Sequence, residues 1–261
     1  MIKPEKLLLI IGNARSGSTI LGAVLDAHPN MVIANETVES SHLWRGMNGE
    51  QILKGIFQNA EQQAFEASRS AVCGHKSQWT PTGKQTVRVV GDKVWNPATL
   101  LLHGNYKLIP SLEERVGAPV IVIHACRNPY DVISTMQSKS GASLRDRIRW
   151  YSAHCEAVAA VSDRMPPERF LHVFHEELIW AAASVLRRCC KFLDVPFSDE
   201  YLRRCNELLF ENPRQTRQDV TWSPDDSDRV DELIKKFPWL SIYSEGECER
   251  WIPSRTEDSK K

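Results

Sequence analysis

A cluster of small and polar residues near the start of the sequence has the composition of an anion-binding loop. Gly12 and Gly17 are close together, and hydroxyl and guanidinium side chains surround the second glycine. Such side chains, together with the backbone N–H groups of a tight loop, donate hydrogen bonds to phosphate or sulfate oxygens. We therefore predict an anion site here, and its donors are Arg15, Ser16, Gly17, Ser18 and Thr19.

The residues on either side of this loop predict a strand and a helix that would hold it. Leu7 to Ile11 form an apolar run, which is typical of a strand that is buried on both faces. After the loop, apolar residues recur at helical spacing as far as Leu25, and His28-Pro29 ends the helix. In such a unit, free N–H groups and the positive end of the helix dipole point at a bound anion. An ordinary strand–turn–helix connection without a ligand is the simpler alternative.

The loop departs from the phosphate loop of nucleoside triphosphatases. Gly12 and Gly17 match the two glycines of that motif, G-x-x-x-x-G-K-[ST], but Ser18 stands where its lysine belongs. The sequence also shows no apolar strand ending in an aspartate that would hold magnesium. We therefore predict a site for a phosphorylated nucleotide that lacks two parts of a triphosphate-hydrolysing site.

The run Arg15-Ser16-Gly17-Ser18-Thr19 resembles, position by position, the [KR]-S-G-[ST]-T loop of sulfotransferases that use 3′-phosphoadenosine 5′-phosphosulfate (PAPS). The longer stretch RSGSTILGAVLDAHPNMVIANET is similar to the corresponding part of the tyrosylprotein sulfotransferases. The resemblance implies that the backbone of this loop holds the 5′-phosphosulfate of PAPS.

The same resemblance implies a catalytic base. Glu36 follows a short apolar run, Met31 to Ala34, at the position of the catalytic glutamate of the tyrosylprotein sulfotransferases. Transfer of a sulfuryl group to a hydroxyl requires a group that accepts the hydroxyl proton, and a carboxylate can do so. A solvated loop glutamate is the alternative. Val38 stands where the compared family member has an arginine, which puts recognition of a peptide tyrosine in doubt.

Lys93 is the second residue to which the resemblance assigns a catalytic role. Val87 to Val90 predicts a short strand, and Gly91-Asp92-Lys93 follows it in a segment that resembles the family's D-K-x-P motif with an insertion before the proline. An ammonium group at the end of a strand can stabilise charge on the oxygen that the sulfuryl group leaves. The alternative is a surface lysine.

A second anion site is predicted in the middle of the chain. Pro119 to His124 reads as a central parallel strand that leads into Ala125-Cys126-Arg127. This segment resembles the family's motif for the 3′-phosphate of the nucleotide, in which an arginine acts with a hydroxyl two helical turns later. The spacing leaves both Ser134 and Thr135 as candidates for that hydroxyl. Near the end of the chain, Arg217 is predicted to contact the nucleotide, and Arg214 is a second candidate.

The order of strands, loops and helices predicts an α/β fold that is P-loop-like and three-layered, with a central, mostly parallel sheet flanked by helices. We expect one sulfotransferase-like domain over residues 1–251 and a polar tail at 252–261. Within the domain, residues 39–85 are expected to form a lid or insertion over the acceptor, with one helix near Ile52 and another over 60–68. The later helices are expected at 108–116, 143–162, 178–193 and 229–237.

Composition limits the classes of function. Lys plus Arg and Asp plus Glu both number 33 in 261 residues, so no overall basic field favours nucleic acid. No apolar stretch approaches the roughly 20 residues of a membrane helix, and the first apolar run is too short for a signal peptide. The seven cysteines include no C-x-x-C pair, which favours reduced, buried thiols over a zinc site. We therefore expect a cytoplasmic protein without nucleic acid, membrane or metal partners.

Taken together, these features predict an enzyme that transfers a sulfuryl group from PAPS to a hydroxyl, or less readily to an amine, of a small molecule or peptide. The products would be 3′-phosphoadenosine 5′-phosphate (PAP) and the sulfated acceptor. Three other classes stay open: a P-loop-type kinase or other NTP-binding protein, which would bind ATP with magnesium, a module that binds PAP without catalysing transfer, and a purely structural protein, which would bind neither nucleotide. The acceptor and the oligomeric state are not determined by the sequence.

Overall fold

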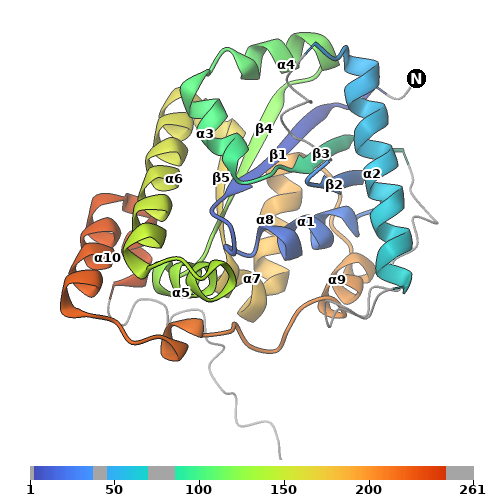
Figure 1. Cartoon of the computed structure of the whole chain (residues 1–261). Coiled ribbons are helices and arrows are strands. Elements are labelled where there is room, and N and C mark those ends of the chain that lie inside the picture. Colours follow the sequence, from blue (N-terminus) through green and yellow to red (C-terminus); the bar gives the residue numbers. More distant parts are fainter. Residues whose placement is uncertain (1–2, 38–45, 70–85, 245–261) are drawn as a thin grey trace, which may run out of the picture.

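The computed structural model of the chain describes residues 3–37, 46–69 and 86–244. Its centre is a five-stranded sheet with the order β2-β3-β1-β4-β5, in which all neighbouring strands are parallel (Figure 1). The strands are β1 (Lys6–Gly12), β2 (Met31–Asn35), β3 (Val89–Lys93), β4 (Val120–Cys126) and β5 (Phe170–Phe174). The predicted α/β fold with a parallel sheet is confirmed.

The sheet is buried because its strands are apolar on both faces. Alternate residues of β1 belong to different clusters of buried side chains: Leu8 and Ile10 pack on one face, and Leu7 and Leu9 on the other. This pattern explains why the strand appears in the sequence as a continuous apolar run.

Helices cover both faces of the sheet and complete the predicted three layers (Figure 1). One buried cluster joins the sheet to α1, α8 and α9, a second joins it to α2, α3 and α4, and a third links α5, α6 and α10 beside the end of β4. The helices are α1 (Ser18–Asp26), α2 (Gly49–Arg69), α3 (Pro97–Gly104), α4 (Leu108–Val116), α5 (Pro129–Ser140), α6 (Leu144–Arg164), α7 (His175–Trp180), α8 (Ala182–Leu193), α9 (Asp199–Asn206) and α10 (Pro224–Lys236). Short 3₁₀ turns also occur in the described residues, at η2 (Pro167–Arg169), η3 (Thr216–Asp219) and η4 (Pro238–Tyr243).

Several element boundaries differ from those predicted. Instead of two helices, residues 49–69 form the single helix α2, whose buried residues Ile52 and Ile56 pack in the cluster that joins it to the sheet. The expected helix over 178–193 is divided into α7 and α8 by the non-helical backbone of Ala181 (φ −134°, ψ 44°). The short helices α3 and α9 were not predicted, because eight residues are too few to show a clear helical period. Segments 38–45 and 70–85 of the expected lid lie outside the described residues.

The described cysteines agree with the expectation of buried thiols. Cys126, Cys155, Cys189, Cys190 and Cys205 are free and buried. The described helices include none that is long and apolar enough to span a bilayer.

A buried histidine pair links the last two strands. His124 on β4 and His172 on β5 are opposite each other in the parallel register, and their Nδ1 atoms lie 2.9 Å apart. The indole of Trp239 stacks on His172 with ring centroids 5.2 Å apart. Burial lowers the pKa of His124 well below its usual range and lowers the pKa of His172 to about 4. Both rings are therefore neutral in the folded protein near pH 7.

We expect the free energy of unfolding to fall as the pH drops below about 6.5. Unfolded histidines take up protons near pH 6.5, whereas the folded pair resists protonation. For each proton that only the unfolded chain binds, the free energy of unfolding falls by at most about 1.4 kcal/mol per pH unit. For His172, this loss continues as the pH approaches 4. Urea unfolding of the wild type and of His172→Asn between pH 7 and pH 5 checks this, because asparagine keeps a polar group near the Nδ1 position without titrating. An equal loss of stability in both proteins would contradict the assignment.

Candidate functional site

The predicted anion loop runs from the end of β1 to the first turn of α1. Gly12 has φ 152° and lies so close to β4 that a Cβ there would be 2.6 Å from the carbonyl oxygen of Ala125. Arg15 and Gly17 have left-handed backbones, with φ 70° and 85°. Gly17 is the N-cap residue of α1, and no side chain caps the helix at this position. The N–H groups of the first turn therefore face the loop, as a phosphate cradle requires.

Buried donors without partners surround the same loop. Within the described part of the chain, Ser16 Oγ and Arg127 Nε are both buried and make no hydrogen bond. A buried polar atom without a partner costs free energy, and such atoms at a functional site are commonly satisfied by a ligand. An oxyanion above the loop would supply acceptors to both.

Arg127, directly after β4, joins the anion loop to a distant segment of the chain. Its Nη1 donates a hydrogen bond to the carbonyl oxygen of Arg15 (3.2 Å), and its Nη2 donates to the carbonyl oxygen of Arg214. Burial lowers the pKa of Arg127, and the nearby carboxylates of Asp131 and Glu176 oppose this effect. The structure thus places a buried guanidinium at the mouth of the loop.

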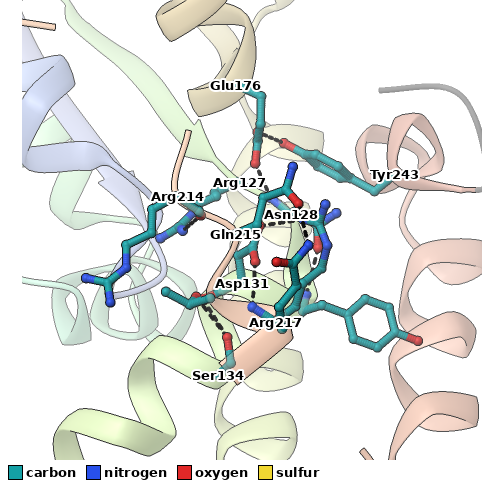
Figure 2. A network of polar contacts seen from close by, with 12 residues as sticks. Arg127, Asn128, Asp131, Ser134, Glu176, Arg214, Gln215, Arg217 and Tyr243 are labelled. Atoms are coloured by element: carbon teal, nitrogen blue, oxygen red, sulfur yellow. Dashed lines mark hydrogen bonds and ion pairs between the residues drawn. The ribbon is translucent and has the colours of Figure 1, made fainter. Parts of the chain in front are cut away.

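The turn that carries Arg127 is fixed from the far end of the described chain (Figure 2). Glu176, the second residue of α7, accepts hydrogen bonds from the backbone N–H of Asn128 (3.0 Å) and from the hydroxyl of Tyr243 (2.7 Å). Asn128 in turn caps α5 by accepting a hydrogen bond from the N–H of Tyr130. Glu176 therefore orients the Arg127 turn.

Both candidate hydroxyls on α5 point at one residue that the sequence analysis missed. The hydroxyl oxygens of Ser134 and Thr135 lie 2.9 and 2.8 Å from Thr216 Oγ1. All three hydroxyls also lie within hydrogen-bond distance of the carbonyl oxygen of Asp131. The arrangement does not distinguish Ser134 from Thr135, although Ser134 is buried and Thr135 is partly exposed.

Arg217, which was predicted to contact the nucleotide, is bound by Asp131 in this structure. Its Nη1 lies 2.6 Å from Asp131 Oδ2, and its backbone N–H donates to Asp131 Oδ1 (2.8 Å). The side chain of Arg214 is exposed and extends away from Arg127 (Figure 2). The segment from 214 to 217 therefore contributes three groups near Arg127: the carbonyl oxygen of Arg214, the hydroxyl of Thr216 and the guanidinium of Arg217, which is paired with Asp131.

Glu36 and Lys93 meet at the ends of β2 and β3. Lys93 Nζ lies 2.5 Å from Glu36 Oε1; the lysine side chain is 7% exposed and that of the glutamate 44%. Glu36 has a left-handed backbone (φ 51°), which is uncommon for a residue with a side chain and typical of functional sites. Its N–H donates to the carbonyl oxygen of Lys93 (2.7 Å). The two predicted catalytic residues are thus in direct contact.

Asp92 holds the residue that follows Glu36. It is fully buried, and its Oδ1 accepts a hydrogen bond from the N–H of Thr37 (3.2 Å). Burial raises the pKa of Asp92 to about 6. The sequence analysis found no strand ending in aspartate, yet β3 carries Asp92 next to its last residue.

The register of the sheet brings both groups of residues to one edge. Lys93 is opposite Ile10, and Ala125, two residues before Arg127, is opposite Gly12. The Glu36–Lys93 pair and Arg127 therefore lie on opposite sides of the loop, at the carboxyl ends of the strands, where open parallel sheets bind ligands. An elongated ligand with anionic groups at two positions fits this arrangement. The described residues contain no group of three or more His, Cys, Asp or Glu side chains that could hold a metal ion.

We expect Gly17→Ala to disable the anion loop. A Cβ at Gly17 would lie 2.8 Å from Cγ of His175, and it would have to tolerate a left-handed backbone. The free energy of unfolding should fall by about 1–3 kcal/mol, and affinity for an anionic nucleotide should drop on the order of tenfold or more. Calorimetry with PAP and urea unfolding measure both effects.

Gly104→Ala is the matched control, because a Cβ at that end of α3 would meet nothing within 4 Å. It should change stability by no more than about 0.5 kcal/mol. If Gly17→Ala behaved like this control, the close contact between the loop and His175 would be unimportant.

Comparisons with known proteins agree with this geometry. A model of the Sulfotransferase family matches residues 8–199. A Caenorhabditis briggsae protein, whose name assigns it provisionally to the protein-tyrosine sulfotransferases, is 23% identical over 209 residues, which cover 78% of this chain and 71% of that protein.

Two solved structures have a similar fold. The sulfotransferase domain of the Synechococcus PCC 7002 olefin synthase gives a TM-score of 0.54 at 17% identity, covering 89% of this chain and 96% of that domain. A mouse sulfotransferase in complex with PAP gives 0.53 at 12% identity, covering 96% and 88% of the two chains. At such identities these similarities concern the fold.

Proposed function

The chain belongs to the sulfotransferase family, whose members are enzymes that transfer a sulfuryl group, and from this premise we propose that PAPS is its donor and a hydroxyl group its acceptor. The observation that carries the proposal is the contact between Arg127 and the carbonyl oxygen of Arg15, because it brings two predicted anion sites within reach of one nucleotide. The mouse relative in the fold comparison was solved with PAP, which is the product of such a donor.

In this proposal the donor lies along the carboxyl edge of the sheet. The backbone of residues 15–19 and the first turn of α1 hold the 5′-phosphosulfate, and the unpartnered Ser16 Oγ adds a donor. Arg127 binds the 3′-phosphate, for which a planar guanidinium is suited. Ser134, Thr135 and Arg217 lie at the same end of the site and complete it.

The chemical step is assigned to the pair at the ends of β2 and β3. Glu36 accepts the proton of the acceptor hydroxyl while its oxygen forms a bond to sulfur. The bond between sulfur and the bridging oxygen of the donor breaks, and Lys93 stabilises the charge that remains on that oxygen. Because Glu36 and Lys93 are already 2.5 Å apart, the acceptor has to enter beside this ion pair. The mechanism gives no step to a metal ion.

The acceptor is proposed only as a class: a hydroxyl on a small molecule or peptide, with an amine as the less favoured choice. Parts of the proposed lid, residues 39–85, would line the acceptor site, and a single domain over 1–251 and a cytoplasmic location complete the proposal. A kinase is disfavoured by Ser18, which stands at the lysine position of a triphosphate loop.

The experiment that tests this function is a screen of hydroxylated small molecules and peptides with ³⁵S-labelled PAPS, preceded by calorimetry with PAP. We expect PAP to bind without magnesium and label to appear in at least one class of hydroxyl compound. Binding of ATP only with magnesium, and no binding of PAP, would favour the kinase. PAP binding without transfer to any acceptor, with wild-type binding in Glu36→Gln, would favour a module that only binds.

A further inference from the structure

The segment from Arg214 to Asp219 is docked on α5 by a small set of buried polar contacts (Figure 2). Thr216 Oγ1 contacts the hydroxyls of Ser134 and Thr135, and Trp222, just beyond the segment, donates its indole N–H to the carbonyl oxygen of Arg217 (3.1 Å). The same indole packs edge-on against Tyr130, with ring centroids 4.8 Å apart. The contacts of Thr216 with Ser134 and Thr135 join residues that are 82 and 81 positions apart in the chain.

Asp131 is at the centre of this docking. Its side chain is 2% exposed, and its two carboxylate oxygens accept the backbone N–H and the guanidinium of Arg217. Its own carbonyl oxygen accepts the hydroxyl of Thr216 (2.9 Å). One residue in the first turn of α5 thus holds two consecutive residues of the segment.

The position of the segment determines the shape of the site around Arg127. The carbonyl oxygen of Arg214 accepts a hydrogen bond from Arg127, and Thr216 lies between the two hydroxyls proposed for the 3′-phosphate. If the segment moved, Arg127 would lose a partner on one side, and Ser134 and Thr135 would keep the carbonyl oxygen of Asp131 but lose the hydroxyl of Thr216. The phosphate end of the site is therefore built only while the segment is docked.

The negative charge of Asp131 also requires the segment to be docked. A buried carboxylate beside a phosphate site would repel the phosphate unless a cation neutralises it. Burial raises the pKa of Asp131, while Arg217 and Arg127 favour its charged form. The ion pair with Arg217 thus lets a carboxylate stay within the site that we propose for an anion.

We propose that Asp131 is a positioning residue for donor binding, which holds the 214–217 segment over the Arg127 end of the site through Arg217 and Thr216. This inference rests on the proposed function. In this inference Arg217 acts mainly by forming the ion pair with Asp131. The alternative is that Arg217 contacts the nucleotide directly.

The test is a double-mutant cycle in the full chain with Asp131→Asn, Arg217→Gln and the double variant. Calorimetry gives the Kd for PAP, and initial rates give KM for PAPS and kcat with an acceptor found in the screen. We expect each single change to raise Kd and KM on the order of tenfold, with kcat at saturating PAPS within about threefold of the wild type. The Kd of the double variant for PAP should not exceed that of the single variant that binds PAP more weakly, because both changes break the same contact between Asp131 and Arg217.

Three outcomes would overturn the inference. Wild-type Kd in Asp131→Asn would do so, as would additive losses in the double variant. A loss in Arg217→Gln much greater than in Asp131→Asn would mean that Arg217 binds the donor directly. Asp163→Asn, an exposed aspartate on α6, is the matched control and should leave Kd unchanged.

Two further measurements separate positioning from general stability. All proteins are compared well below their melting temperatures, and limited proteolysis follows cleavage between 207 and 222, which PAP should suppress in the wild type more than in Asp131→Asn.

If Asp131→Asn does not fold, Thr216→Val tests the other contact of Asp131 and should raise the Kd for PAP; an unchanged Kd there would overturn the inference. A wild type that fails to bind PAP would instead refute the proposed function itself.

Discussion

Replacing Glu36 by glutamine is expected to lower kcat on the order of a hundredfold or more while leaving the Kd for PAP nearly unchanged. The amide cannot accept the acceptor proton, but it can still accept a hydrogen bond from Lys93, which lies 2.5 Å from the carboxylate in the wild type. The geometry of the site is therefore kept while the base is removed. Initial rates with labelled PAPS and calorimetry with PAP give the two quantities.

Glu61→Gln is the matched control for this change, since Glu61 is an exposed glutamate on α2. It should leave kcat and Kd at their wild-type values. Loss of PAP affinity in Glu36→Gln would show that Glu36 belongs to the donor site, and an unchanged kcat would remove it from the proton transfer.

The second large effect is expected for Arg127→Ala, which should raise the Kd for PAP about a hundredfold or more. The buried guanidinium would be lost, and with it the link between the carbonyl oxygens of Arg15 and Arg214. Arg127→Lys should bind PAP with intermediate affinity, because an ammonium keeps the charge but cannot form two parallel hydrogen bonds to a phosphate. Calorimetry with PAP measures the series.

Arg149→Ala serves as the control, because that arginine is exposed on α6. If Arg127→Ala bound PAP as tightly as this control, the second anion site would have to lie elsewhere. The nucleotide could then not extend from the 12–19 loop to the end of β4.

The parts of the site that follow directly from a strand could be predicted from the sequence. Gly12 to Thr19 and Arg127 each come straight after an apolar run, so the topology of a parallel sheet brings them to the same edge. Lys93 ends β3 for the same reason, although the predicted strand ended three residues earlier.

The residues that sequence reasoning missed act through distant partners. Thr216 contacts Ser134 across 82 positions, and Tyr243 contacts Glu176 across 67. A threonine in a polar segment or a tyrosine in a short apolar run has no pattern that identifies its partner. Asp92 was overlooked because a single acidic residue after two valines and a glycine does not reveal that its side chain is buried.

The bond between Glu176 and Tyr243 also bears on how the protein is made. Because Tyr243 is added long after Arg127 during synthesis, a chain still attached to the ribosome lacks the hydroxyl that helps to fix the Asn128 turn. The nascent chain can form the sheet from β1 to β5 first, and the anion site around Arg127 becomes complete only when η4 has emerged from the exit tunnel and packed. The capacity to bind the nucleotide would therefore be acquired only after Tyr243 has been synthesised and has packed.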